Sequence, residues 1–276
     1  MSNKLIDSFF SIWLRKKLYS FTIKLSKTKV KYHIEIENDY TPFTDKPIIF
    51  ACNHSAFPDT PIALRAIKRH CYVLSGKQNL NIEDKLFFFL SGAIWVDRQD
   101  KNDTFKAKTK TIEYLKKGQP ILWFPEATWN LTTNLLMLPM RWGIIEVAQA
   151  TNAQIIPIVI DYDFNKMLCK IRFGNILTTN EIIDKKQGIE KLRDEMATLK
   201  WDFITHRKQN RSTLNLAEEK IELNKPIYDY PPINWDYEQK CIYQFKNVTN
   251  YEKAFNHLEK LKPSIQNAFL FNKRLK

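Results

Sequence analysis

Short apolar runs alternate with segments of helical periodicity along most of this chain, and that alternation limits the folds open to it. The apolar runs are of strand length and fall at residues 30–36, 47–51, 71–74, 94–96, 121–124, 155–160 and 168–173. The helical patterns lie between and after them, at about residues 60–69, 81–90, 103–117, 143–150 and 189–203. Strands and helices that alternate in this way predict an α/β fold, with a single sheet covered by helices.

Three local signals sharpen this prediction. Asp59, followed by Pro61, predicts a helix start with a capping carboxylate. Asp103 predicts the cap of the helix that runs to Lys117. Pro157 interrupts an apolar strand, and because proline cannot donate a ladder hydrogen bond we expect a bulge or special turn there.

The two ends of the chain differ in composition from residues 30–206, which we expect to form the α/β domain. Residues 1–29 combine many lysines with Trp13 and other apolar residues at helical spacing, which predicts a basic amphipathic helical segment apposed to a membrane. The alternative for this segment, a helix packed against the domain, stays open. Residues 207–276 form an aromatic and basic C-terminal extension, with a role in packing, membrane contact or partner binding.

The net charge of +13 requires an acidic partner, such as nucleic acid, an anionic membrane surface or an acidic substrate. No helix-turn-helix, zinc finger or Gly-rich RNA-binding signature is present, which argues against nucleic acid. The four cysteines form no Cys-x-x-Cys pair, so we expect no metal and free buried thiols in a reducing compartment, although four cysteines could pair in an oxidising one. We find no apolar stretch of spanning length and no secretory signal, and expect a cytoplasmic protein peripheral on the inner face of the cell membrane.

The chemistry is concentrated after the apolar run 47–51, which delivers His54 to a loop. Asp59 lies five positions further on, and on a continuous helix the two side chains would point about 140° apart. They can meet only if the segment bends, and Pro58 disfavours helix at the residue before it. A carboxylate on one imidazole nitrogen would leave the other as a general base for an alcohol. The alternative is a loop histidine beside a simple N-cap.

Four stretches in order resemble the motifs of the glycerolipid acyltransferase family, whose best-known members acylate lysophosphatidic acid. The segment from His54 to Asp59 resembles its His-x4-Asp motif, and 92–98 (Gly-Ala-Ile-Trp-Val-Asp-Arg) resembles its second motif. Residues 124–128 (Phe-Pro-Glu-Ala-Thr) are similar to the third, and the apolar run around Pro157 to the fourth.

The resemblance implies catalytic roles for His54 and Asp59, with no metal and no cofactor. It implies that the donor is an acyl thioester, either acyl-CoA or acyl carrier protein, and that the enzyme works at an anionic lipid surface. The residues that it implies for substrate binding are Asn53, Gly92, Arg98, Pro125, Glu126 and Thr128.

The third motif departs from the family, which usually has glycine and arginine where this chain has Ala127 and Trp129. The acceptor could then be a sugar or lipid hydroxyl, or Arg141 or another nearby base could replace the lost guanidinium. The leading hypothesis is an O-acyltransferase acting on a lysophospholipid or a related lipid or glycolipid. The alternative is a non-catalytic, basic, peripheral membrane-binding protein on a degenerate acyltransferase fold.

Overall fold

The computed structural model describes residues 9–27, 32–43, 45–56, 58–77, 82–130, 136–163, 166–182 and 184–205. Its strands are β1 (His33–Ile36), β2 (Ile48–Cys52), β3 (Tyr72–Gly76), β4 (Ala93–Val96), β5 (Ile121–Trp123), β6 (Gln154–Asp163) and β7 (Leu168–Phe173). Its helices are α1 (Phe9–Lys27), α2 (Asp59–Ile67), α3 (Ile82–Ser91), α4 (Lys101–Lys116), α5 (Gly143–Thr151) and α6 (Lys185–Thr205), with a short 3-10 helix at Thr179–Glu181. The predicted extension, 207–276, lies outside the described residues.

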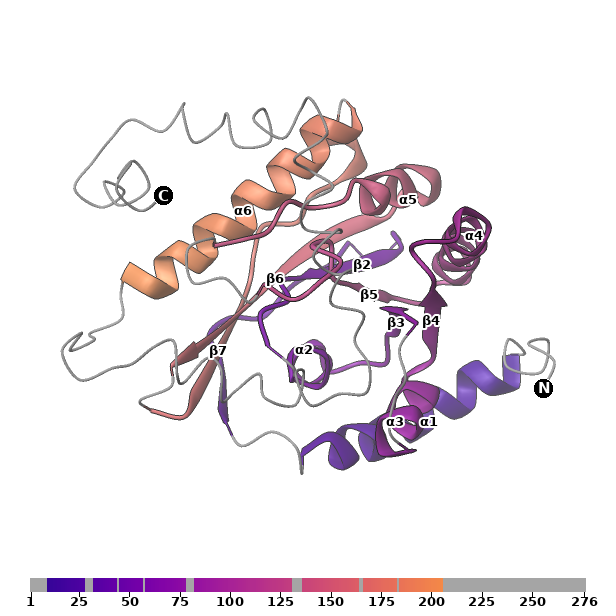
Figure 1. Ribbon diagram of the computed structural model, residues 1–276, viewed down its shortest axis with the longest axis horizontal. Helices are drawn as coiled ribbons and strands as arrows, with labels where there is room; N and C mark the ends of the chain where they lie inside the picture. The colour runs from indigo at the N-terminus through magenta and orange to yellow at the C-terminus, as the bar shows by residue number, and fades with distance from the viewer. Residues whose placement is uncertain are drawn as a thin grey trace.

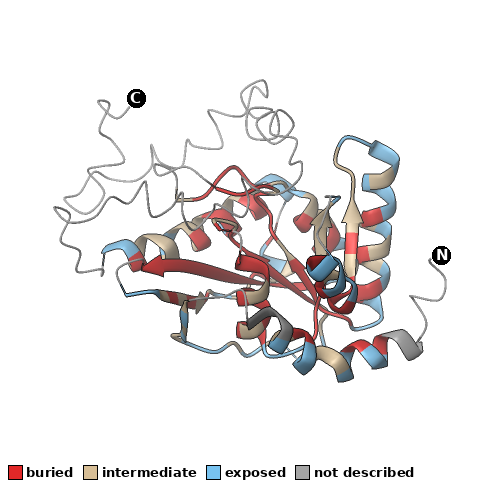
Figure 2. Ribbon diagram, turned by 60° about the horizontal axis from the view of Figure 1, so that its bottom comes forward, coloured by how far each residue is buried: buried red, intermediate tan, exposed pale blue. Residues whose placement is uncertain are grey.

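The strands form one mixed sheet in the order β1-β7-β6-β2-β5-β3-β4 (Figure 1). Neighbouring strands are parallel except β6 and β7, which are antiparallel. The central strands β2 and β6 are buried along their whole length (Figure 2). This arrangement confirms the predicted α/β class with a single helix-covered sheet.

Side-chain alternation along the strands divides the core between the two faces of the sheet. On β2, Ile49 and Ala51 pack with residues of α4, α5 and α6, whereas Phe50 and Cys52 pack with residues of α2. The predicted apolar face of α6 is confirmed, because four of its apolar residues are buried: Ile189, Leu192, Met196 and Phe203.

Three local predictions need correction. α4 begins at Lys101 with Asp100 as its N-cap, while Asp103 accepts a hydrogen bond from the Asp97 amide at 2.6 Å and pairs with Lys77. α2 begins at Asp59 itself, and its N-cap, Pro58, makes no side-chain cap bond.

The third correction concerns Pro157, because β6 continues through it without a break. The irregularity lies in the segment that pairs with β6. Ile155 and Ile158 are three residues apart along β6, but their partners, Leu177 and Phe173, are four residues apart. The Pro157 carbonyl still accepts from the Gly174 amide at 2.9 Å. Proline is tolerated here because its missing donor falls where the β6–β7 ladder ends.

Helix α1 packs against α2 and α3. Arg15, which is buried, donates from Nη1 to the carbonyls of Phe89 and Leu90 at the C-terminal end of α3. Trp13 and Phe21, by contrast, remain about half exposed on the outer side of α1. The helix therefore packs on the domain and also presents apolar side chains outward. Among the described residues, no helix is long and apolar enough to cross a membrane.

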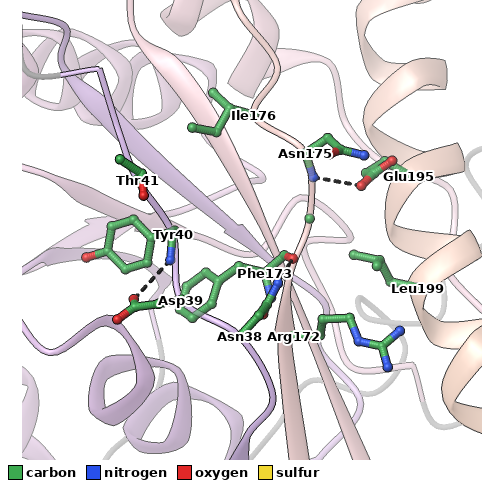
Figure 3. A pocket seen from close by; sticks show the side chains of 11 residues that line it. Asn38, Asp39, Tyr40, Thr41, Arg172, Phe173, Asn175, Ile176, Glu195 and Leu199 are labelled. Carbon is green, nitrogen blue, oxygen red and sulfur yellow. Dashed lines mark hydrogen bonds between the residues drawn. The ribbon is translucent and has the colours of Figure 1, made fainter.

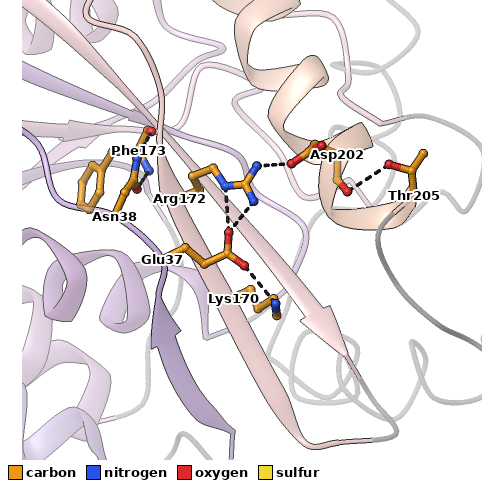
Figure 4. A network of polar contacts seen from close by, with 7 residues as sticks. All are labelled: Glu37, Asn38, Lys170, Arg172, Phe173, Asp202 and Thr205. Carbon is orange, nitrogen blue, oxygen red and sulfur yellow. Dashed lines mark hydrogen bonds and ion pairs between the residues drawn. The ribbon is translucent and has the colours of Figure 1, made fainter.

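Charged side chains fasten β1, β7 and α6 together at one end of the sheet (Figure 4). Glu37 accepts from Lys170 at 3.0 Å and from Arg172 Nε at 2.8 Å, and Arg172 also pairs with Asp202 of α6. A groove of about 370 Å³ lies nearby, lined by Tyr40, Phe173 and Glu195 among others (Figure 3). Its walls follow the carboxyl ends of β1 and β7, which lie toward the amino end of β6 because β7 runs antiparallel to it.

Candidate active site

Three of the predicted motifs meet at one edge of the sheet because each follows the carboxyl end of a parallel strand. His54 follows β2, Arg98 follows β4 and Glu126 follows β5. Loops at the carboxyl ends of strands are where α/β proteins gather reacting groups. The edge therefore brings together residues that lie more than seventy positions apart in the sequence.

His54 and Asp59 are in contact, as the sequence predicted for a bent segment. Nδ1 of His54 lies 3.1 Å from Oδ2 of Asp59, whose side chain is fully buried. The same oxygen accepts the backbone N–H groups of Ser55 at 2.6 Å and Ala56 at 2.7 Å. These two bonds hold the bend that turns the imidazole back toward the carboxylate. The alternative interpretation of Asp59 as a simple N-cap is wrong.

The contact fixes which imidazole nitrogen is available for chemistry. An ionised carboxylate can only accept hydrogen bonds, so Nδ1 carries the proton that lies between the two groups. Nε2 is then unprotonated in the neutral ring and can act as a base. The His54 side chain is 14% exposed, so it is sheltered but still reaches solvent.

The third motif braces the histidine loop from the neighbouring strand end. Oε1 of Glu126 accepts the backbone N–H of His54 at 2.9 Å, and Oε2 accepts that of Leu138 at 2.6 Å. The amide of Asn130 in turn donates to the His54 carbonyl at 2.5 Å. Glu126 is almost fully buried, and its carboxylate orients the loop. The predicted role of Glu126 in binding an acceptor stays a prediction.

Burial dominates the electrostatics of Glu126. Desolvation raises the pKa of its carboxyl to about 7, against the opposing effect of the two backbone N–H donors. A charge at this position is therefore costly in the folded chain, since it has been removed from water.

Aromatic side chains form the walls around the imidazole. The Phe124 ring stacks on it, with centroids 4.3 Å apart and planes 29° apart. The Trp129 ring is tilted against it at 5.1 Å, and its buried indole Nε1 has no hydrogen-bond partner among the described residues. Trp129, which stands where the family usually has arginine, thus lies directly against the candidate base.

Arg98 reaches across the edge from the second motif to the third. Its guanidinium donates to the carbonyl of Ala127 and lies close to Gly76, where an added Cβ would come within 3.4 Å of Nη2. Ala127 has a φ of 61°, in the left-handed region that favours glycine. The turn therefore has a backbone conformation that suits the glycine usual in the family better than the alanine present here.

The remaining predicted binding residues fall into two groups. Asn53, Pro125 and Thr128 lie buried at the same edge. The Asn53 amide bonds to both backbone groups of Ile160, at 2.7 and 3.1 Å, so its side chain extends the β2–β6 pairing beyond Cys52. The Pro125 carbonyl accepts the amide of Arg141 at 2.9 Å.

Gly92 does not join them, and its predicted role in substrate binding stays a prediction. It precedes β4, so it lies at the opposite end of that strand from Arg98. Its φ is +74°, and an added Cβ would meet the Tyr72 ring at 2.7 Å. Glycine is needed here for backbone conformation and close packing.

Cys52 is a core residue, as expected. It is fully buried, and desolvation together with the nearby Asp59 raises the pKa of its thiol well above its ordinary value. A thiol held in this protonated form is a poor nucleophile.

Sequence reasoning missed two residues that lie next to the His54–Asp59 pair. Tyr162 of β6 donates its hydroxyl to Oδ1 of Asp59 at 2.5 Å. Lys200 of α6 pairs with Asp161 at 2.7 Å, donates to the Ile160 carbonyl at 2.9 Å and feels the charge of Asp59. Strand alternation puts Tyr162 on the same face as Ile158 and Ile160, and that was the available signal.

Comparison with known proteins agrees with these motifs. Residues 31–161 match the family model described as Acyltransferase. A 1-acyl-sn-glycerol-3-phosphate acyltransferase of Saccharomyces cerevisiae is 31% identical over 171 residues, which is 56% of each chain. One of Chlamydomonas reinhardtii is 28% identical over 126 residues, or 45% of this chain and 37% of that one. The aligned region thus spans about half or less of the length of these curated relatives.

The fold is also that of a solved enzyme. The crystal structure of the 1-acyl-sn-glycerophosphate (LPA) acyltransferase PlsC from Thermotoga maritima matches with a TM-score of 0.57, over 71% of this chain and 83% of that one. Sequence identity in this match is 14%, so the likeness shows the fold alone. The His-x4-Asp pair assembled at the strand edge lies within residues 31–161, and this part of the chain is similar to the acyltransferase family.

Proposed function

We propose that this protein is an O-acyltransferase that moves a fatty acyl group from an acyl thioester to a hydroxyl of a lysophospholipid or related lipid or glycolipid. The observation that carries the proposal is the 3.1 Å contact between His54 and the buried Asp59. It leaves one imidazole nitrogen as a base at an edge where the ring still reaches solvent.

The chemistry follows from the two nitrogens of the ring. Nε2 of His54 takes the proton of the acceptor hydroxyl as its oxygen attacks the thioester carbonyl carbon. The tetrahedral intermediate then collapses, the carbon–sulfur bond breaks, and the imidazolium returns the proton to the leaving thiolate. Asp59 stays ionised throughout and stabilises the imidazolium. Base catalysis of this kind contributes about 10²- to 10⁴-fold, with orientation adding more.

The substrate class rests on the relatives and on the charge at the edge. The curated relatives are named 1-acyl-sn-glycerol-3-phosphate acyltransferases, which supports a lysophospholipid acceptor. Arg98 lies beside the third motif, and a guanidinium matches the geometry of a phosphate. The proposed donor is acyl-CoA or acyl carrier protein.

The test uses the full chain, a labelled acyl thioester and lysophosphatidic acid or a lipid extract as acceptor. The unaltered protein should form labelled lipid and release thiol, while His54→Ala should lose at least about 10²-fold in rate. His33→Ala removes an exposed histidine from β1 and serves as the matched control. Full activity in His54→Ala would remove the proposed mechanism, and a protein that releases no thiol with any donor would be the non-catalytic membrane-binding alternative.

We also propose that the enzyme works as a peripheral protein on the cytoplasmic face of an anionic membrane, through α1 and α3. These helices pack side by side, and six of their apolar residues are at least 37% exposed: Trp13, Leu14, Phe21, Ile82, Leu86 and Phe89. Lys16, Lys17 and Lys24 on α1 are exposed as well. Aromatic side chains flanked by lysines suit the interface of an anionic bilayer.

Sedimentation with phosphatidylglycerol vesicles checks this surface. Removing Trp13, Phe21 and Phe89 together by alanine substitution should lower the bound fraction severalfold, since each large apolar side chain contributes to interfacial binding. Phe105→Ala removes an aromatic ring that is 70% exposed on α4 and is the control. Equal loss in both variants would contradict the assignment of the surface to α1 and α3.

A further inference from the structure

The buried carboxylate of Asp59 is held by groups from two sides, and only one side belongs to the histidine motif. Oδ2 lies against His54 Nδ1 and the amides of Ser55 and Ala56. Oδ1 accepts the hydroxyl of Tyr162 at 2.5 Å. The second oxygen is thus fixed from strand β6, about a hundred residues away in the sequence.

The ring of Tyr162 is enclosed by the sheet and by a second aromatic side chain. Tyr162 is 5% exposed and pairs with Cys169 across the β6–β7 ladder. Tyr32 packs edge-on against its ring, with centroids 5.3 Å apart and planes at 76°. Since a carboxylate can only accept hydrogen bonds, the phenol O–H is the donor in its hydrogen bond to Asp59. Burial, together with the charge of Asp59, raises the pKa of the phenol well above its usual range.

A neutral donor suits this position better than a cation would. A cation on Oδ1 would compete with the imidazolium for the charge of Asp59 and would itself have to be desolvated. Lys200 is a cation that feels the charge of Asp59, but its ammonium is already bonded to Asp161 and the Ile160 carbonyl. The phenol stabilises the carboxylate without supplying a second charge.

We propose that Tyr162 is a positioning residue of the His54–Asp59 pair: its hydroxyl holds the carboxylate in place and moderates the basicity of His54. The proposal rests on the proposed function, in which His54 is the base. Removing the donor concentrates negative charge on Asp59, which then holds the protonated imidazole more strongly. The groups that surround the pair and also act on it are Glu126, Lys200, Cys52 and Cys169, together with the rings of Phe124 and Trp129.

Tyr162→Phe tests the proposal, because it deletes the hydroxyl and keeps the ring. Tyr40→Phe is the matched control: Tyr40 donates to the Ile67 carbonyl at 2.9 Å, so this change also removes a hydroxyl that contacts α2. We expect Tyr162→Phe to lower kcat about tenfold with little change in KM. In the pH profile of kcat/KM for this variant, the acid limb should lie about half to one pH unit higher than in the unaltered enzyme. Tyr40→Phe should have the same kcat as the unaltered enzyme and the same acid limb in the pH profile of kcat/KM.

An NMR titration of the histidine rings keeps this test separate from the proposed function. The His54 signal, assigned by its loss in His54→Gln, should titrate about half to one pH unit higher in Tyr162→Phe than in the unaltered protein or Tyr40→Phe. This readout holds even for a protein that consumes no thioester. An unchanged His54 titration in Tyr162→Phe, or equal shifts in both variants, would overturn the proposal.

Discussion

A single methyl group strains the turn of the third motif. Ala127 adopts a φ of 61°, which costs a residue with a Cβ about 1–2 kcal/mol relative to glycine. Glycine recovers this cost but loses some of the gain to its larger freedom in the unfolded chain. The strain is local, because the Ala127 carbonyl is also held by Arg98.

We therefore expect Ala127→Gly to stabilise the protein by about 1 kcal/mol in urea unfolding. Ala150→Gly, at an exposed position in α5, should instead destabilise it by about the same amount, since helical glycine has no left-handed strain to relieve. If both glycine variants lose stability equally, the turn is not strained in solution.

The carboxyl of Glu126 makes stability depend on pH in the opposite sense to an ordinary surface acid. Burial raises its pKa from 4.5 to about 7. Between these two values the folded chain binds more protons than the unfolded chain, so the free energy of unfolding falls as pH rises. The loss amounts to about 3 kcal/mol across that window.

Glu126→Gln should flatten this fall in stability between about pH 4.5 and 7, measured by urea unfolding at a series of pH values. The variant will lose part of its stability at every pH, because an amide offers one acceptor where the carboxylate serves the two amides of His54 and Leu138. Glu113→Gln, on the exposed side of α4, is the control. A slope that persists in Glu126→Gln assigns the titration to another group.

Among the elements, α1 is tied to the domain by a buried charged side chain, Arg15. Arg15 donates to the Phe89 and Leu90 carbonyls at the end of α3, where a helix presents unpaired carbonyls and partial negative charge. Its stem also lies 3.5 Å from where a Cβ on Gly92 would be. The contact joins the first helix to the turn before β4.

Arg15→Met keeps an apolar stem of similar length but removes the donors. We expect amide exchange within α1 to speed up by at least about tenfold, because loss of a charged hydrogen bond favours local opening of the helix. Lys16→Met, a change at the exposed neighbouring residue, should leave exchange unaltered. Equal protection in Arg15→Met and the unaltered protein would show that the other contacts of α1, such as the bond from the Tyr19 hydroxyl to the Leu64 carbonyl, hold it without Arg15.

Periodicity predicted most of the elements because strand and helix patterns are local. It did not predict which backbone amides the carboxylates of Asp59 and Asp103 would accept hydrogen bonds from. Asp59 and Asp103 both looked like helix caps, yet each bonds to backbone amides of a preceding loop, since the strand ends bring those amides within reach. The His54–Asp59 pair was predictable from one short motif. The contact with Tyr162 was not, because it depends on which strand lies next to β2.

At the scale of the whole molecule, some charged residues form balanced ion pairs within the fold, while others make up the surplus of positive charge. The network of Glu37, Lys170, Arg172 and Asp202 balances its charges and ties the far edge of the sheet to α6. The net charge of +13 is carried elsewhere, including the exposed lysines of α1. A surplus of this size attracts anionic lipid over a distance set by ionic strength.

Binding to phosphatidylglycerol vesicles should therefore weaken as salt increases from about 0.1 M to about 1 M, where the screening length falls from about 10 Å to about 3 Å. Apolar insertion by Trp13 and Phe21 is not screened, so a residual bound fraction should persist at high salt and fall when these two residues are replaced by alanine. Phosphatidylcholine vesicles should show only the residual fraction at every salt concentration. Tight binding to duplex DNA with a steeper salt dependence than to the vesicles would instead identify nucleic acid as the partner that the charge serves.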